Sequence, residues 1–348
     1  MSLAVERDLS TVASGITRWL AAQRGVADLA LTRCDRPTEG LSSETLMVEA
    51  AGSGPDGPYA ESLVVRLAPS AAGIFPEYAL AVQAHAQDAA AANGVPAAVP
   101  AELETDPQWI GAPFMVMPAI EGHIPGPAPS HDRWINESIE QAGLVSRRLF
   151  DTLAAIHTVD WRAAGLDRVV PVRDLDGELA YWTRYLDWYA GGEVAAPALH
   201  EALAWCRAHR PKDDPPAAFL WGDVRLGNII FDEQRNPVAV LDWEMTTIGA
   251  PEHDLAWYLT LEWIQTELFG AAVPGFLAPD DACAYYEAQV GRSLQSLEWF
   301  EVFAMLRSSA IMTRLAVVQE QQGAQPMLPI ADNPILDLLS RRITEADA

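Results

Sequence analysis

Three oxygen-bearing side chains in the second half of the chain could hold a cation or move a proton. Asp223 and Asn228 lie in the segment WGDVRLGN, and Asp242 follows in LDWE. All three adjoin short apolar runs, where an unpaired carboxylate is costly, so they indicate a ligand or a reacting group. A hard cation such as Mg²⁺ prefers carboxylate and amide oxygens. The alternative is that these residues only form turns beside a hairpin.

The first part of the chain predicts a small sheet accompanied by helices. Residues 5–24 have helical apolar spacing, residues 29–70 contain three strand-like pieces separated by turn residues, and residues 78–93 are Ala-rich and helical. Two more strand candidates flank a turn at Asp106, the second being PFMVMPAI. We therefore expect a three-strand antiparallel meander, a helix and two further strands.

A Pro- and Gly-rich break at residues 121–130 separates this part from a mostly helical remainder. Two short apolar runs around a turn at residues 234–237 interrupt the helical pattern, and they carry the three side chains named above at their ends. The combination predicts an α+β fold with two lobes, residues 1–120 and 121–348.

The composition restricts the partners and the compartment. The chain has 23 Lys and Arg against 48 Asp and Glu, a formal net charge of −25, which disfavours nucleic acid as a partner. Its three cysteines, Cys34, Cys206 and Cys283, are far apart, which argues against a disulfide framework or a zinc site. No stretch has the length and apolarity of a membrane span, and the N-terminus lacks a signal-peptide pattern. We therefore expect a soluble cytoplasmic protein.

The pattern D-x-x-x-x-N, followed by an apolar strand that ends in Asp, is that of the catalytic and metal loops of protein-kinase-like phosphotransferases. The longer run GDVRLGNIIFD, continued by PVAVLDWEMTTIGAPEHDLAW, resembles the aminoglycoside phosphotransferase family. Within that family it is most similar to the branch related to the kinase-like domain of certain acyl-CoA dehydrogenases. The resemblance implies a protein-kinase-like fold, with a nucleotide-binding lobe and a larger catalytic lobe. It also implies an enzyme that uses ATP and Mg²⁺ to phosphorylate a hydroxyl group of a small molecule.

The resemblance also implies a role for each matching position. Asp223 would be the catalytic base or would orient the acceptor hydroxyl, and Asn228 and Asp242 would hold the Mg²⁺. Asp254 would brace the catalytic loop. The implied nucleotide contacts lie in a phosphate-covering turn, in the third strand and at the hinge between the lobes: Gly40, Ser42, Ser43, Arg66, Pro118, Ala119 and Ile120.

Two positions depart from the family pattern. Arg66 stands where most kinase folds have Lys, and Gln83 stands where the helix usually has a Glu partner, so the expected ion pair becomes at best a hydrogen bond. Arg66 is either a phosphate clamp, since Arg can contact two oxygens at once, or a lone charge at a strand edge. These departures motivate an alternative, a catalytically silent nucleotide-binding or scaffolding protein. Retention of the three polar residues of the catalytic and metal loops counts against that alternative.

The acceptor is predicted from the aromatic residues of the helical part. Tyr181, Trp182, Tyr185, Trp188 and Tyr189 share one helical stripe, which either packs in the core or walls a substrate site. Few acids accompany this stripe and the stretch LAWYLTLEWIQTELF, namely Asp187, Glu262 and Glu267. Because an aminoglycoside needs several acids to pair its ammonium groups, we favour a hydroxylated metabolite, such as a hydroxyacyl thioester, over an aminoglycoside.

Overall fold

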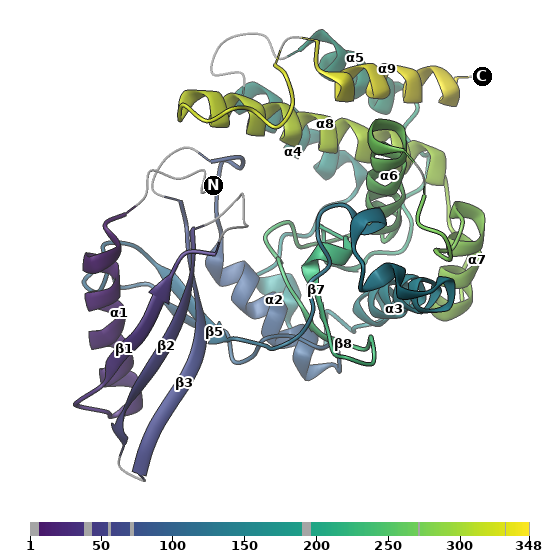
Figure 1. Ribbon diagram of the computed structural model, residues 1–348. Coiled ribbons are helices and arrows are strands. Elements are labelled where there is room, and N and C mark those ends of the chain that lie inside the picture. Colours follow the sequence, from purple (N-terminus) through teal and green to yellow (C-terminus); the bar gives the residue numbers. More distant parts are fainter. Residues whose placement is uncertain are drawn as a thin grey trace.

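The computed structural model describes residues 7–37, 44–54, 57–69, 73–189, 196–270, 272–330 and 332–347. It contains a five-stranded sheet with two helices, next to a larger part made mainly of helices (Figure 1). The predicted α+β, protein-kinase-like architecture is confirmed.

The sheet is antiparallel throughout, in the order β1-β2-β3-β5-β4. Its strands are β1 (Ala30–Asp35), β2 (Glu44–Gly54), β3 (Gly57–Leu67), β4 (Glu102–Glu104) and β5 (Phe114–Pro118). The predicted meander is confirmed, as are the two further strands. The stretch from Gly52 to Gly57 matches GxGxxG literally, but Gly54 pairs with Gly57 across a hairpin and no helix follows it. This Gly-rich stretch is therefore not a nucleotide-binding turn.

Each face of the sheet is covered by one helix, α1 (Leu9–Arg24) on one face and α2 (Leu80–Ala92) on the other. Alternate residues of a strand point to opposite faces, so Phe114 and Val116 pack with α1 while Met115 packs with α2. In β3, every second residue from Leu63 to Leu67 joins the α1 side. This alternation places Arg66 on the opposite face, toward the rest of the molecule.

The larger part begins after β5. Its helices are α3 (Ile139–His157), α4 (Leu175–Tyr189), α5 (Pro197–Ala208), α6 (Glu252–Phe269), α7 (Pro279–Val290), α8 (Leu297–Gln321) and α9 (Pro334–Ala346). Short 3₁₀ turns are η1 (Pro129–His131), η2 (Ile135–Glu137), η3 (Leu166–Arg168) and η4 (Leu226–Asn228). Two small antiparallel strand pairs hold the motif, which is the segment with Asp223, Asn228 and Asp242. They are β6 (Ala218–Leu220) with β9 (Thr247–Gly249), and β7 (Ile229–Phe231) with β8 (Pro237–Val240). The chain crosses into this part near the predicted break, but the lobe limits 1–120 and 121–348 remain a prediction.

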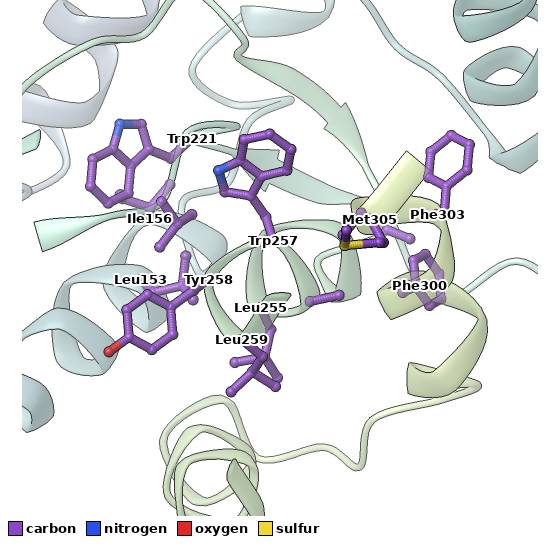
Figure 2. Close-up of a cluster of buried hydrophobic side chains, with 14 of the residues drawn as sticks. Leu153, Ile156, Trp221, Leu255, Trp257, Tyr258, Leu259, Phe300, Phe303 and Met305 are labelled. Atoms are coloured by element: carbon purple, nitrogen blue, oxygen red, sulfur yellow. The ribbon is translucent and has the colours of Figure 1, made fainter. Parts of the chain in front are cut away.

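The core of the larger part forms where α3, α6 and α8 pack against one another and against the motif. Leu153 and Ile156 of α3, Tyr258 of α6 and Phe300 of α8 are all buried in one cluster (Figure 2). Trp221, two residues before Asp223 in the sequence, lies fully buried in the same cluster. The motif is therefore anchored in the helical core. None of the helices in the described ranges is long and apolar enough to cross a bilayer.

Candidate active site

The loop that carries Asp223 is held by the first turn of α6. The carboxylate of Asp254, which has no exposed surface, accepts the backbone N–H groups of Trp221 and Gly222 at 2.8 and 3.0 Å. Its Oδ2 also lies 3.0 Å from Nε2 of His157. Gly222 has a φ of 97°, and a Cβ there would lie 2.2 Å from the carbonyl oxygen of Met245. Only glycine fits this turn, and Asp254 has the bracing position predicted for it.

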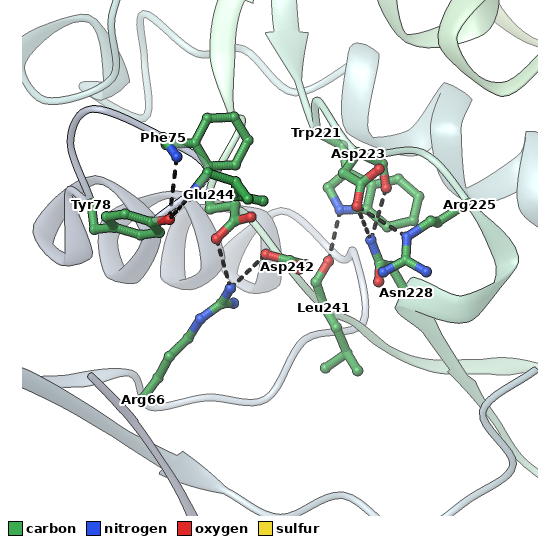
Figure 3. Close-up of polar contacts among 11 residues, drawn as sticks. Arg66, Phe75, Tyr78, Trp221, Asp223, Arg225, Asn228, Leu241, Asp242 and Glu244 are labelled. Carbon is green, nitrogen blue, oxygen red and sulfur yellow. Dashed lines mark hydrogen bonds and ion pairs between the residues drawn. The ribbon is translucent and has the colours of Figure 1, made fainter. Parts of the chain in front are cut away.

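Both carboxylate oxygens of Asp223 accept hydrogen bonds, and Figure 3 shows those from Asn228 and Arg225. The indole Nε1 of Trp257 donates to Oδ1 at 2.9 Å, while Nδ2 of Asn228 and Nε of Arg225 donate to Oδ2 at 2.8 and 3.0 Å. Nδ2 of Asn228 also donates to the backbone carbonyl of Asp223 at 3.0 Å. These bonds fix the orientation of the carboxylate. They also leave the amide oxygen of Asn228 as the group available to a ligand, because its nitrogen is already engaged.

Backbone hydrogen bonds bring Asp242 next to this loop. The N–H of Leu241 donates to the carbonyl of Asn228 at 2.8 Å, and the indole of Trp221 donates to the carbonyl of Leu241 at 2.8 Å. Asp242 itself has a φ of 59°, a left-handed conformation that is uncommon outside glycine and often found at functional sites. The structure thus brings together Asp223, Asn228 and Asp242. The carboxylate of Asp242 and the amide oxygen of Asn228 are hard oxygen donors of the type that Mg²⁺ requires.

Arg66 reaches this cluster from the sheet (Figure 3). Its Nη2 donates to Oδ1 of Asp242 at 2.7 Å and to Oε2 of Glu244 at 3.1 Å. Burial alone would lower the pKa of Arg66, but the carboxylates of Asp242 and Glu244 outweigh it and raise the pKa. Arg66 is not hydrogen-bonded to Gln83, because Oε1 of Gln83 is buried without a partner. Glu244, two residues after Asp242, offers Arg66 a charged acceptor that an amide cannot match.

The three residues predicted to form the hinge lie at the end of β5 and directly after it. Pro118 ends the strand, and the N–H of Ala119 donates to the carbonyl of Ser62 at 2.9 Å. Ile120 packs beside the α2 side of the sheet, and no described group accepts its N–H. Proline has no N–H, so Ile120 is the hinge residue that retains a donor for a ligand. The predicted phosphate-covering turn, with Gly40, Ser42 and Ser43, lies outside the described residues.

A cavity of about 430 Å³ lies beside the catalytic loop. Its walls come from the segment around the start of α2, from α4 and the residues before it, from the segments around Gly222 and after Asp242, from two residues of α6 and from one of α8. Among the residues that line it are Glu77, Arg173, Glu178, Tyr181, Trp182, Arg184, Tyr185, Trp188, Gly222, Glu244, His253, Asp254 and Arg307. Four of the five residues in the aromatic stripe of α4 line this cavity, and Trp182 and Tyr185 are also buried in the core. The stripe therefore packs in the core and also lines the cavity.

The acids predicted to lie near the acceptor are not the ones that line the cavity. Asp187, Glu262 and Glu267 contribute nothing to its walls, and Glu267 pairs with Arg341 at 2.9 Å. Most of α6 also faces the core instead of the cavity, because the helix is covered by α8. The prediction missed Trp257 and Arg307, which approach the site only through tertiary packing.

Comparison with known proteins agrees with this geometry. The sequence model of the phosphotransferase enzyme family matches residues 34–286, more than half of the chain. The chain belongs to this family. Acyl-CoA dehydrogenase family member 11 from Gallus gallus is 31% identical over 179 residues, which cover 50% of this chain and 22% of that protein. Family member 10 from Mus musculus is 31% identical over 204 residues, covering 56% of this chain and 18% of the relative. The chain thus matches only about a fifth of the length of these relatives.

Solved structures show the same fold. A Ralstonia eutropha protein described as an aminoglycoside phosphotransferase has a TM-score of 0.71 at 22% identity, with 95% of this chain and 98% of that chain covered. A thermostable aminoglycoside phosphotransferase mutant in a ternary complex with ADP and hygromycin B has a TM-score of 0.57 at 11% identity, with 95% and 97% covered. Family membership and fold make this phosphotransferase a small-molecule kinase.

Proposed function

We propose that this phosphotransferase transfers the γ-phosphoryl group of ATP, with Mg²⁺, to a hydroxyl group of a hydroxylated metabolite, a hydroxyacyl thioester being favoured. The observation that carries the proposal is the convergence of Asp223, Asn228 and Asp242 beside a cavity with aromatic walls. Phosphoryl transfer needs mainly positioning and charge neutralisation, so these few residues suffice.

Asp223 is proposed to orient the acceptor hydroxyl and to accept its proton. The oxygen of that hydroxyl forms a bond to the γ-phosphorus while the bond to the β-phosphate oxygen breaks, and ADP leaves. Hydrogen bonds from Trp257 and Asn228 hold the carboxylate in place before the substrate arrives, so less reorganisation is needed during the reaction.

Asn228 and Asp242 are proposed to hold the Mg²⁺ through one amide and one carboxylate oxygen. The bound cation would neutralise charge on the phosphates of the nucleotide. Arg66, which now pairs with Asp242 and Glu244, lies where it can contact the same phosphates. Ile120 is proposed to donate its N–H to the adenine, and the turn with Gly40, Ser42 and Ser43 to cover the phosphates.

The charges of the cavity favour a metabolite over an aminoglycoside. Of its acids, Glu178 pairs with Arg173 at 3.3 Å, and Asp254 is occupied by the catalytic loop. Glu244 is engaged by Arg66. A polycationic antibiotic would therefore find few acids without a partner, whereas aromatic walls suit an aliphatic chain.

A screen of ATP consumption tests the proposal. Wild-type protein with Mg²⁺ is incubated with hydroxylated metabolites, hydroxyacyl thioesters and aminoglycosides, and products are identified by ³¹P NMR. Asp223→Asn should lower turnover of the best acceptor by about two to four orders of magnitude while ATP affinity changes little. Asp213→Asn, at an exposed position without a described partner, is the matched control. Turnover of Asp223→Asn within threefold of the control would remove Asp223 from the mechanism. A wild type that binds ATP but phosphorylates nothing would favour the silent alternative.

A further inference from the structure

Arg307 is a buried cation without a hydrogen-bonding partner among the described residues. It lies in α8 with 6% of its surface exposed, and its Nε is buried with no acceptor. Its Cζ lies 4.8 Å from the ring centroid of Trp257 and 5.5 Å from that of Trp182. Aromatic faces attract a guanidinium, but they do not replace the oxygen acceptors that its N–H groups require.

Packing does not explain a charge at this position. Leu306 and Ser308, its neighbours in α8, are buried as well, so the helix is enclosed there. Burial lowers the pKa of Arg307, and the carboxylates of Glu178 and Asp254 oppose this only in part. A buried charge is costly unless it is paired. Arg307 is buried, has no hydrogen-bond acceptor and lines a cavity, so it indicates an anionic ligand.

Among the described residues, no carboxylate of the cavity is hydrogen-bonded to Arg307, although Glu178 and Asp254 lie near enough to act on its pKa. Glu178 is bonded to Arg173, and the carboxylate of Asp254 accepts backbone N–H groups. Burial lowers the pKa of His253 well below its usual value, so the imidazole adds no positive charge. The guanidinium of Arg307 therefore has N–H groups without an oxygen acceptor, which an anionic group of a ligand would supply.

One side chain connects this arginine with the catalytic carboxylate. The edge of the Trp257 indole donates to Oδ1 of Asp223, and its face holds the guanidinium of Arg307. Figure 2 shows Trp257 among the buried side chains between the catalytic loop and α8. The hydroxyl site and the anion site are thus separated by about the width of one indole ring, with the aromatic wall of α4 beside them.

We propose that Arg307 selects an acceptor that carries an anionic group, a carboxylate or a phosphate, on the same short carbon chain as the hydroxyl group that is phosphorylated. The inference rests on the proposed transfer to a hydroxyl group of a metabolite, and among the proposed acceptors it selects free hydroxy acids or hydroxyalkyl phosphates over a thioester, whose acyl carbon is uncharged. The planar guanidinium can bind two oxygens of either anion at once. The aromatic side chains of α4 bind the apolar carbons between the two polar ends.

Calorimetric binding tests this inference without requiring turnover. The probes are linear hydroxy acids from 3-hydroxybutanoate to 6-hydroxyhexanoate, the neutral amides of the same acids, and hydroxyalkyl phosphates of matched length. We expect Arg307→Met to weaken binding of the preferred anionic series by about 10- to 100-fold and to leave amide binding unchanged. Arg307→Lys should retain part of the preference for anions. The series that wild type binds more tightly distinguishes a carboxylate from a phosphate.

Arg314→Met is the matched control, because Arg314 also lies in α8 and over a Trp ring but donates to the carbonyl of Gly73 and does not line the cavity. Arg314→Met should not change how much more tightly the protein binds the anionic probes than their neutral amides. The inference is overturned if wild type binds amides as tightly as both anionic series, or if Arg307→Met and Arg307→Lys bind anions as wild type does. Anions that bind through Arg307 but receive no phosphate would support the anion site and refute the proposed reaction.

Discussion

Removal of the Asp254 carboxylate should lower the free energy of unfolding more than removal of an exposed Asp carboxylate does. Its two oxygens accept two backbone N–H groups and face His157, and the residue is fully buried. Asp254→Ala leaves at least two buried N–H groups without acceptors, at about 1–3 kcal/mol each, or about 2–6 kcal/mol in total. Domains are typically stable by about 5–15 kcal/mol, so much of the folded population is at risk.

Urea unfolding measures this loss, with Asp281→Ala as the control. Asp281 also lies in the first turn of a helix but is exposed, so its removal tests the contribution of a carboxylate near a helix N-terminus, about 0.3–1 kcal/mol. Asp254→Asn keeps one acceptor oxygen, and we expect an intermediate loss of stability together with reduced turnover, because the loop of Asp223 is less well held. Equal unfolding free energies for Asp254→Ala and Asp281→Ala would refute the reasoning.

Two further predictions concern charged residues of the site, and a third concerns Glu262, which lies outside the cavity. Asp242→Ala should abolish the Mg²⁺-dependent tightening of ATP binding in calorimetry, and a mutant that keeps it would place the metal elsewhere. Arg66→Ala should weaken ATP binding by about 10- to 100-fold, with Arg66→Lys intermediate, since Lys lacks the planar fork; unchanged affinity in the Ala variant would exclude a phosphate clamp. Burial raises the pKa of Glu262 to about 7. The unfolded chain ionises at lower pH, so the free energy of unfolding should fall by about 3 kcal/mol as pH rises from about 4.5 to about 7, and level off above. Glu262→Gln should remove that slope in urea titrations, and a wild type without the slope would contradict the assignment.

Local patterns predicted most of the fold because they report interactions close in sequence. Turn residues between apolar runs located β1, β2 and β3, and the Ala-rich composition located α2. The strand β9 was missed, since three residues of a buried sequence carry no detectable alternation. Its partner β6 lies far away in sequence and is paired by tertiary packing. The cavity was likewise beyond prediction, because its walls come from segments that are spread along the sequence from Phe75 to Arg307.

The residues of the candidate site likewise divide into those that a local motif predicts and those that only the fold brings together. Asn228 and Asp242 flank the hairpin of β7 and β8, and Asp223 lies five residues before Asn228, so a local motif was enough to predict that the three lie close together. Glu244 is the second acid of LDWE, two residues after Asp242, and could have been found from the sequence. Arg307 had a weaker signal, a single charge in the apolar run VFAMLRSSAIM, and nothing in the sequence indicated which aromatic rings would surround it.

Helix α6 contacts both the loop of Asp223 and Arg307. Asp254 and Trp257 are three residues apart, so they lie on one face of the helix. Asp254 binds the backbone of the loop, whereas Trp257 binds the carboxylate of Asp223 with its edge and Arg307 with its face. A change that rotates α6 would therefore move the loop, the carboxylate of Asp223 and the surroundings of Arg307 together. Because α6 packs against α8, we expect substitutions in this contact to affect the proposed phosphoryl transfer and the proposed choice of acceptor together.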